Sequence, residues 1–85
     1  MNKPPLDTIK TLLINTYQPT AFTLEDESQA HANHPGMQAN QYHLILSIKA
    51  KELNQLSIID AHKHIYQTLH TYMPFIHALS IKILK

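Results

Sequence analysis

The sequence has no cysteine and no arginine, and Gly36 is its single glycine. Without cysteine, the chain cannot form disulfides, use a catalytic thiolate or hold a metal through its own thiolates. Without arginine, it lacks the side chain best suited to forked contacts with phosphate and guanine, which argues against strong, sequence-specific nucleic-acid binding. One glycine also cannot build a P-loop or a GxGxxG turn, so nucleotide-binding loops of these types are excluded.

Long apolar runs are absent as well. None approaches the roughly 20 residues that a membrane-spanning helix needs. The N-terminus has no apolar run followed by a small-residue cleavage site, so no signal peptide is predicted. We therefore expect a cytoplasmic protein with no membrane partner. A chain of 85 residues has room for one small domain, residues 1–85, and no second core.

Two helices are predicted from apolar residues at helical spacing. The first runs from about Pro5 to Asn15 or Thr16. The second begins after Ser57, which is followed by an acidic residue three positions later as in a capping box, and it ends at about Tyr72, before Pro74. Residues 51–56 are expected to form a turn or one short helical turn.

Three strands are predicted, over residues 20–25, 42–50 and 78–84, from β-branched and alternating apolar residues. The first two should pair antiparallel across a polar loop, residues 26–41. The helical crossover between the second and third makes these two parallel if they are adjacent. The expected fold is an α+β, two-layer domain of order αββ(α)αβ, with a three-stranded mixed sheet and helices on one face.

Seven histidines are far more than a chain of this length usually has. His31 and His34 lie three apart in the loop, and His43 follows. The three could bind a divalent metal, but two histidines alone make a weak site, and a solvated polar loop that happens to contain histidines is the favoured interpretation. His62 flanks the buried stripe of the second helix and is expected to pack, whereas His64 is expected to be exposed, as is Lys63.

His77 falls between the second helix and the last strand, where a tight turn is expected. By position alone it is most often a turn histidine bonded to backbone. The alternative is a metal ligand that faces a partner.

Three pieces of the sequence resemble the BolA-like family, over about residues 22–82. DESQAH, from Asp26, resembles the family's (D/N)-E-S-x-x-H loop, and YHL, from Tyr42, resembles its x-H-F strand start. HKHIYQTL, from His62, followed by IHALSI, from Ile76, resembles RHRxVYxxL…IHALxI. This last piece is the most specific of the three.

The resemblance implies a fold similar to the class II KH domain, with a helix-turn-helix-like portion before the last strand. It also implies a heterodimer with a monothiol glutaredoxin that shares a 2Fe–2S cluster, with the partner's cysteine and glutathione on one iron. His77 aligns with the family's near-invariant ligand and His31 with its loop ligand; His34 and His43 are reserves. Histidines replace cysteines on one iron in Rieske-type ligation, so a cysteine-free chain suits this role.

The leading hypothesis is therefore a non-enzymatic adaptor in iron–sulfur cluster assembly, trafficking or iron regulation. Its partner-binding residues are expected to be His62, Lys63, His77 and Ala78, and alone it is expected to be a monomer or weak homodimer. The alternative is a DNA-binding transcriptional regulator, with weak binding through a face formed by Lys49, Lys51, Lys63 and Lys82. This alternative is weakened because Ala61 and Lys63 stand where the family has arginines. RNA binding of the KH type is not expected either, because Gly36 alone cannot form the GxxG loop of a KH domain.

Overall fold

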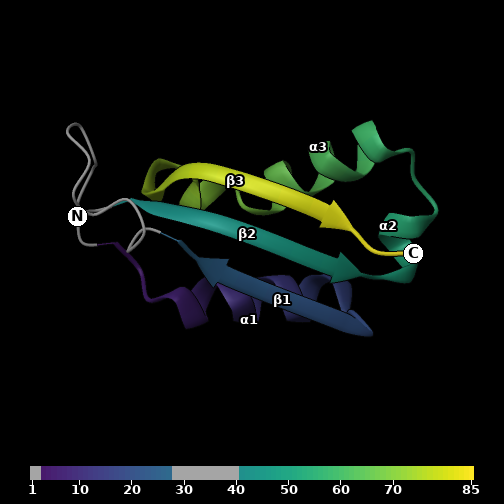
Figure 1. The fold of residues 1–85 in the computed structure, drawn as a ribbon, viewed down its shortest axis with the longest axis horizontal. Coiled ribbons are helices and arrows are strands. Elements are labelled where there is room, and N and C mark those ends of the chain that lie inside the picture. Colours follow the sequence, from purple (N-terminus) through teal and green to yellow (C-terminus); the bar gives the residue numbers. More distant parts are fainter. Residues whose placement is uncertain (1–2, 28–40) are drawn as a thin grey trace.

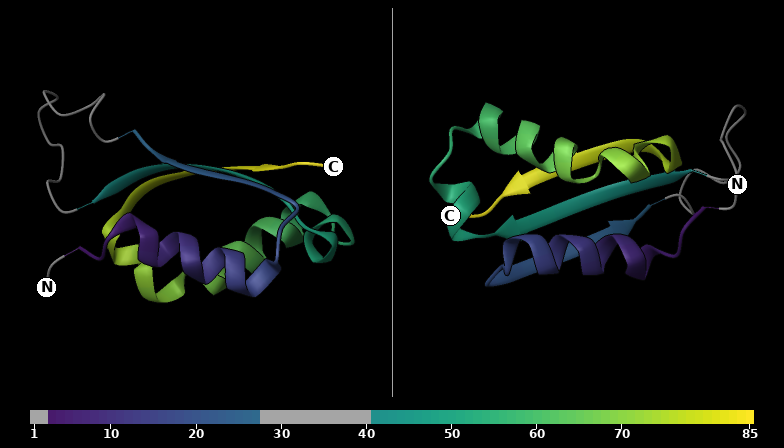
Figure 2. Two further views of the ribbon diagram at one scale, coloured as in Figure 1. Left: turned by 90° about the horizontal axis from the view of Figure 1, so that it is seen from below. Right: turned by 180° about the vertical axis from the view of Figure 1, so that it is seen from behind.

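The computed structural model describes residues 3–27 and 41–85 as one three-stranded sheet with its helices in a second layer (Figure 1). The elements in chain order are α1 (Leu6–Tyr17), β1 (Ala21–Asp26), β2 (Tyr42–Lys49), α2 (Lys51–Asn54), α3 (Ile58–Thr68), the 3₁₀ helix η2 (His70–Phe75) and β3 (Ile76–Ile83). The side view in Figure 2 places α1 and α3 on the same face of the sheet. The predicted α+β class, element order and single helical layer are confirmed.

The sheet has the order β1-β2-β3, with β2 in the centre. β1 and β2 are antiparallel, and β2 and β3 are parallel, as the sequence predicted. The parallel pair is joined through α3, which is the kind of crossover that parallel strands require. Among the described residues, β3 therefore has β2 on one side and no strand on the other.

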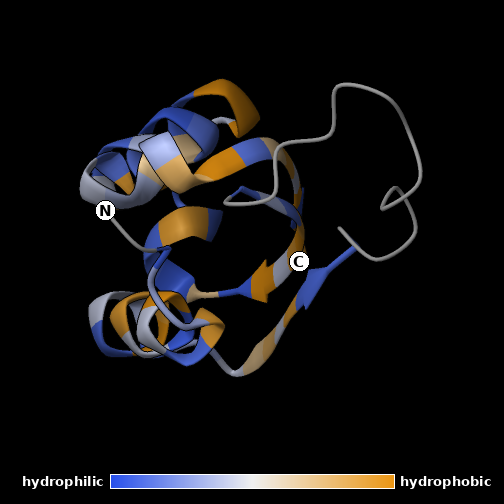
Figure 3. Ribbon diagram, turned by 90° about the vertical axis from the view of Figure 1, so that its left-hand side faces the viewer, coloured by the Kyte–Doolittle hydropathy of each residue, from blue (hydrophilic) through white to orange (hydrophobic). Residues whose placement is uncertain are grey.

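The core lies between the sheet and the helices. Alternate residues of β2 point toward the helices and are buried, namely Tyr42, Leu44, Leu46 and Ile48. The helices contribute apolar residues at helical spacing: Ile9, Leu13 and Tyr17 from α1, and Ala61 and Ile65 from α3. Seen end-on in Figure 3, the described helices all lie on one side of the sheet. The predicted face of β2 is confirmed, because a period of two permits only one apolar face.

Both long helices end differently from the prediction. α1 extends to Tyr17 because that residue is buried, and Gln18 then closes the helix in a left-handed conformation at φ 47°, with its N–H donated to the carbonyl of Ile14. α3 begins as predicted, since the hydroxyl of Ser57 accepts the N–H of Asp60 at 3.1 Å. It ends at Thr68, however, and not at Tyr72.

The segment after α3 is the 3₁₀ helix η2, which contains Pro74. The N–H groups of Tyr72 and Met73 both bond the carbonyl of Leu69, so the backbone forms a tight 3₁₀ turn before Pro74. Pro74 has no N–H and therefore leaves no donor unpaired there. β3 then starts at Ile76, two residues earlier than predicted. The expected turn through His77 is wrong, because His77 is the second residue of β3.

The polar segment predicted as a loop from residue 26 to 41 begins later than expected. Asp26 belongs to β1, and its carboxylate accepts the backbone N–H of His43 at 3.3 Å. The N–H of Glu27 bonds the carbonyl of His43 at 2.7 Å, so the antiparallel pairing continues beyond β1. His31 and His34 lie outside the described residues. Among the described helices, none is long and apolar enough to span a membrane.

Candidate functional site

His77 occupies an irregular position at the start of β3. Tyr42 is opposite Ile76 and His43 is opposite Ala78, so His77 is an extra residue that has no counterpart on β2. This two-against-one arrangement is a β-bulge, a feature that re-aims side chains and is common beside functional sites. Ile76 is buried, whereas His77 and Ala78 are both exposed.

The sequence of β3 explains why a bulge forms there. The inward-facing apolar residues are Ile76, Leu79, Ile81 and Ile83. The first gap is three residues and the later gaps are two, so a regular strand would place Ile76 and Leu79 on opposite faces. The extra residue restores the phase and keeps all four on the helix side. The phase slip was visible in the sequence, but sequence reasoning missed it.

The bulge brings His77 next to His43. Their rings stack with centroids 4.9 Å apart and an interplanar angle of 29°. His43 is half-buried on the face of the sheet that lacks helices, which we call the open face, and His77 is exposed on the same face. Two predicted metal-site residues, one of them a reserve, are therefore neighbours.

His43 is also held by the backbone on its β1 side. Its N–H donates to the Asp26 carboxylate, and its carbonyl accepts the N–H of Glu27. Being on the central strand, it is fixed in position by β1 and β3 together. The stacked pair thus rests on the rigid part of the sheet.

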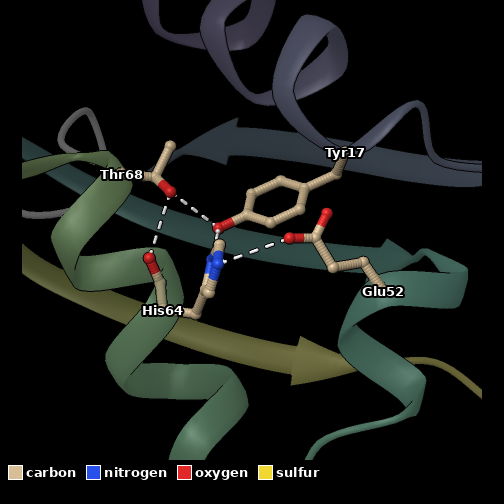
Figure 4. A network of polar contacts seen from close by, with 4 residues as sticks. All are labelled: Tyr17, Glu52, His64 and Thr68. Carbon is tan, nitrogen blue, oxygen red and sulfur yellow. Dashed lines mark hydrogen bonds and ion pairs between the residues drawn. The ribbon is translucent and has the colours of Figure 1, made fainter.

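A second histidine cluster lies between the helices, and Figure 4 shows it in close view. The hydroxyl of Tyr17 on α1 lies 2.7 Å from Nδ1 of His64 and 2.8 Å from Oγ1 of Thr68. Nε2 of His64 lies 3.3 Å from a carboxylate oxygen of Glu52 on α2. The expectation that His64 is exposed holds only in part. Its side chain keeps 37% of its accessible surface, but it bonds Tyr17 because the side chains of residues 64 and 68, one turn apart, both face α1.

Two tyrosines have raised pKa values. Burial raises the pKa of Tyr17 above its ordinary value of 10.0; the Thr68 hydrogen bond lowers it in part, and the negative charge of Glu52 adds to the rise. Burial likewise raises the pKa of Tyr42, with a further contribution from Asp26. The hydroxyl of Tyr42 donates to the carbonyl of Pro4 at 2.7 Å. Both phenols stay protonated at ordinary pH, because their pKa values are raised above 10.0.

The described residues contain no group of three or more histidines, aspartates or glutamates that could hold a metal ion. His77 presents an exposed imidazole on the open face, with the half-buried ring of His43 stacked against it, so an ion or cluster bound there needs ligands from outside the described residues. Imidazole is an ordinary ligand for zinc, copper, nickel and iron. The open face can therefore contribute to a shared metal centre.

The family model described as BolA-like protein matches residues 13–85. This chain belongs to the BolA-like family. The BolA domain of SufE1 from Arabidopsis thaliana is similar, with a TM-score of 0.76 and 29% identity, covering 91% of this chain and 86% of that chain. BolA1 from the same plant shares the fold, with a TM-score of 0.78 and 24% identity, covering 98% and 93%. BolA1 from Mus musculus gives 0.72 and 21%, covering 96% and 66%. No curated protein matches the chain.

In this BolA-like domain, the four residues predicted to bind a partner lie in two layers. His77 and Ala78 are on the open face, whereas His62 and Lys63 are on α3 in the helical layer. His62 is half-buried and Lys63 is exposed. A partner that contacts all four must pass around the outer edge of β3.

The lysines are divided in the same way. Lys49 and Lys82 fall on the open face by their register, whereas Lys63 is exposed on α3 and Lys51 is in α2. The continuous lysine face expected for a DNA-binding BolA-like protein is therefore not formed by these residues. Strand register places two of these lysines on the open face, whereas the other two belong to helices. Which helical and strand residues share one surface cannot be predicted from the sequence alone.

Proposed function

We propose that this BolA-like domain is a non-enzymatic, cytoplasmic adaptor that binds a monothiol glutaredoxin and shares a 2Fe–2S cluster with it. The role would lie in cluster assembly, trafficking or iron regulation. The observation that carries the proposal is the exposed His77, held by a bulge on the open face of a chain without cysteine.

A chain that offers histidine but no cysteine suits a cluster whose ligands are divided between two proteins. A thiolate-free domain cannot complete a cluster site alone, so the glutaredoxin cysteine and glutathione must supply the sulfur ligands. When bound, the cluster supplies electron-accepting or transferable iron and sulfide. This chain supplies imidazole ligation from His77 and a rigid surface that orients it toward the partner.

His31 is the proposed second ligand from the segment between β1 and β2. It follows Glu27 by four residues, and four residues span at most about 14 Å. Glu27 is bonded to the backbone of His43, which stacks on His77. Chain length therefore permits His31 to reach the same end of the sheet, with His34 and His43 as the reserves.

The proposed docking surface consists of His77 and Ala78 on the open face together with His62 and Lys63 on α3. These residues flank the outer edge of β3, where backbone groups have no strand partner among the described residues. Such an edge is a ready site for another chain. We propose that the free domain is monomeric or a weak homodimer and docks through this edge.

The test is to add the purified domain to a glutaredoxin loaded with a 2Fe–2S cluster and to record visible circular dichroism. Ligand exchange at one iron should change the spectrum in proportion to the amount of domain added, until one equivalent is bound. The His77→Ala variant should leave the glutaredoxin spectrum unchanged. His70→Ala is the matched control, because His70 is exposed in η2 and away from the open face. An unchanged spectrum with the wild-type domain, or a change that persists in the His77→Ala variant, would contradict the proposal.

A further inference from the structure

We propose that His43 is a positioning residue, whose ring holds the imidazole of His77 in one orientation and does not itself bind iron. The two rings stack on the open face, where β2 and β3 meet at the bulge. This role rests on the proposed function of His77 as a cluster ligand. It assigns to His43 a task different from that of a reserve ligand.

His77 needs support from another strand. It is exposed, and as the extra residue of the bulge it has no counterpart on β2. Its neighbour Ala78 is also exposed and offers a single methyl group, which cannot hold an imidazole in place. An exposed side chain without support moves among several rotamers, and this freedom is lost when the side chain binds a ligand. A fixed ring beside His77 therefore raises its affinity for a cluster.

The geometry of the two rings is that of a stack. Their centroids are 4.9 Å apart and their planes are inclined by 29°, which is within the range of offset-stacked aromatic pairs. The nitrogen lone pairs of an imidazole lie in the plane of its ring, so two nearly parallel rings do not direct them at one ion. Nε2 of His43 is also buried. His43 is therefore placed to support His77 and not to share its iron.

His43 is itself held firmly, as a support must be. It is half-buried on the central strand, between the buried residues Tyr42 and Leu44. Its N–H donates to the Asp26 carboxylate, and its carbonyl accepts the N–H of Glu27. A ligand keeps its orientation only when the residues around it are locked by packing and hydrogen bonds. The sheet thus fixes His43, and the ring of His43 fixes His77.

Two substitutions separate a positioning role from a ligand role. His43→Phe keeps a flat ring that can stack on His77 but removes both ring nitrogens, whereas His43→Ala removes the ring altogether. Phenylalanine preserves the function of a positioning residue, but it cannot replace a ligand. Ile45→Ala is the matched control for a loss of packing, because Ile45 is half-buried on the same face of β2. Far-ultraviolet circular dichroism verifies that each variant folds.

The first measurement uses the free domain and needs no partner. In the intact chain, NMR couplings between the α and β protons of His77 report whether its side chain keeps one rotamer. We expect the couplings of a single rotamer in the wild type, in His43→Phe and in Ile45→Ala, and averaged couplings in His43→Ala. Averaged couplings in the wild type, or couplings that do not change in His43→Ala, would overturn the positioning role.

The second measurement titrates cluster-loaded glutaredoxin with each variant and follows visible circular dichroism. His43→Ala should need roughly two to ten times more protein to reach the midpoint, because one free side chain must be ordered on binding. It should reach the final spectrum of the wild type, since the iron ligands are the same. His43→Phe and Ile45→Ala should titrate like the wild type.

The outcomes of the titration distinguish the two proposals. If the wild-type domain leaves the glutaredoxin spectrum unchanged, the proposed function fails, and the role of His43 toward a cluster fails with it. If the change depends on His77 but His43→Ala titrates like the wild type, only the positioning role fails. It also fails if the final spectrum of His43→Phe differs from that of the wild type, because His43 would then be a ligand.

Discussion

Along β2, the residues that point toward the helices are apolar and buried, whereas those on the open face are mostly polar and half-buried or exposed. Leu46 has no exposed surface, and its neighbour Ser47 is on the other side of the same strand. The helix side holds the domain together, and the open side carries the histidine pair. Alternation within a single strand therefore separates stability from recognition.

The histidines repeat this contrast. His64 is tied to Tyr17, which is 47 residues earlier in the chain, and to Glu52, so it links three helices. His77, by contrast, is exposed, and its ring stacks on that of His43. The same side chain thus serves the fold in one place and is available to a ligand in the other.

The largest expected effect compares the two faces directly. Leu46→Ala removes a fully buried side chain from the core and should lower the free energy of unfolding by roughly 2–5 kcal/mol. Ser47→Ala, one residue away on the open face, should change it by no more than about 0.5 kcal/mol. Urea unfolding followed by far-ultraviolet circular dichroism measures both. Equal losses for the two variants would contradict the division between the faces.

A smaller effect is expected from the link between the helices. Tyr17→Phe removes the hydroxyl that contacts His64 and Thr68, and should lower the free energy of unfolding by about 1–2 kcal/mol. Tyr66→Phe is the matched control, because Tyr66 is 42% exposed on α3, and its loss should be near zero. If both variants unfold at the same urea concentration as the wild type, the network contributes nothing to stability.

The smallest expected effect is the response to alkali. The folded-state pKa of Tyr17 is raised above the ordinary 10.0, and so is that of Tyr42, so the folded protein retains these protons longer than the unfolded chain. The stability that this difference provides is fully present below pH 10 and is lost as the pH rises through the folded pKa values. Thermal melts across this range should show a decline that is shallower in Tyr17→Phe. A decline of equal slope in that variant would show that Tyr17 is not responsible.

Much of the fold follows from local pattern. The alternation of Tyr42 to Ile48, the Ser57 cap and the crossover rule were enough to predict the strands, the start of α3 and the mixed sheet. The end of α3 could not be predicted in this way, because Pro74 is compatible with a 3₁₀ turn as well as with a stop.

The site was predicted only in part. His77 was singled out by its motif, but its pairing with His43 depends on the bulge and on strand register, which are set by tertiary packing. The role of His64 depends on a tyrosine on another helix, and no local pattern contains that contact. The three-residue gap from Ile76 to Leu79 is the one local signal that could have revealed the bulge.

The most direct test of the central claim, that the open face around His77 receives the cluster, is an NMR map of the bound state. The ¹⁵N-labelled domain is mixed with cluster-loaded glutaredoxin, and amide signals close to the iron are broadened by its unpaired electrons. Broadening is expected at His43 and at Ile76–Ala78, with the signals of Ile9 and Leu13 on α1 unaffected. Broadening centred on α1, with sharp signals at His43 and His77, would contradict it.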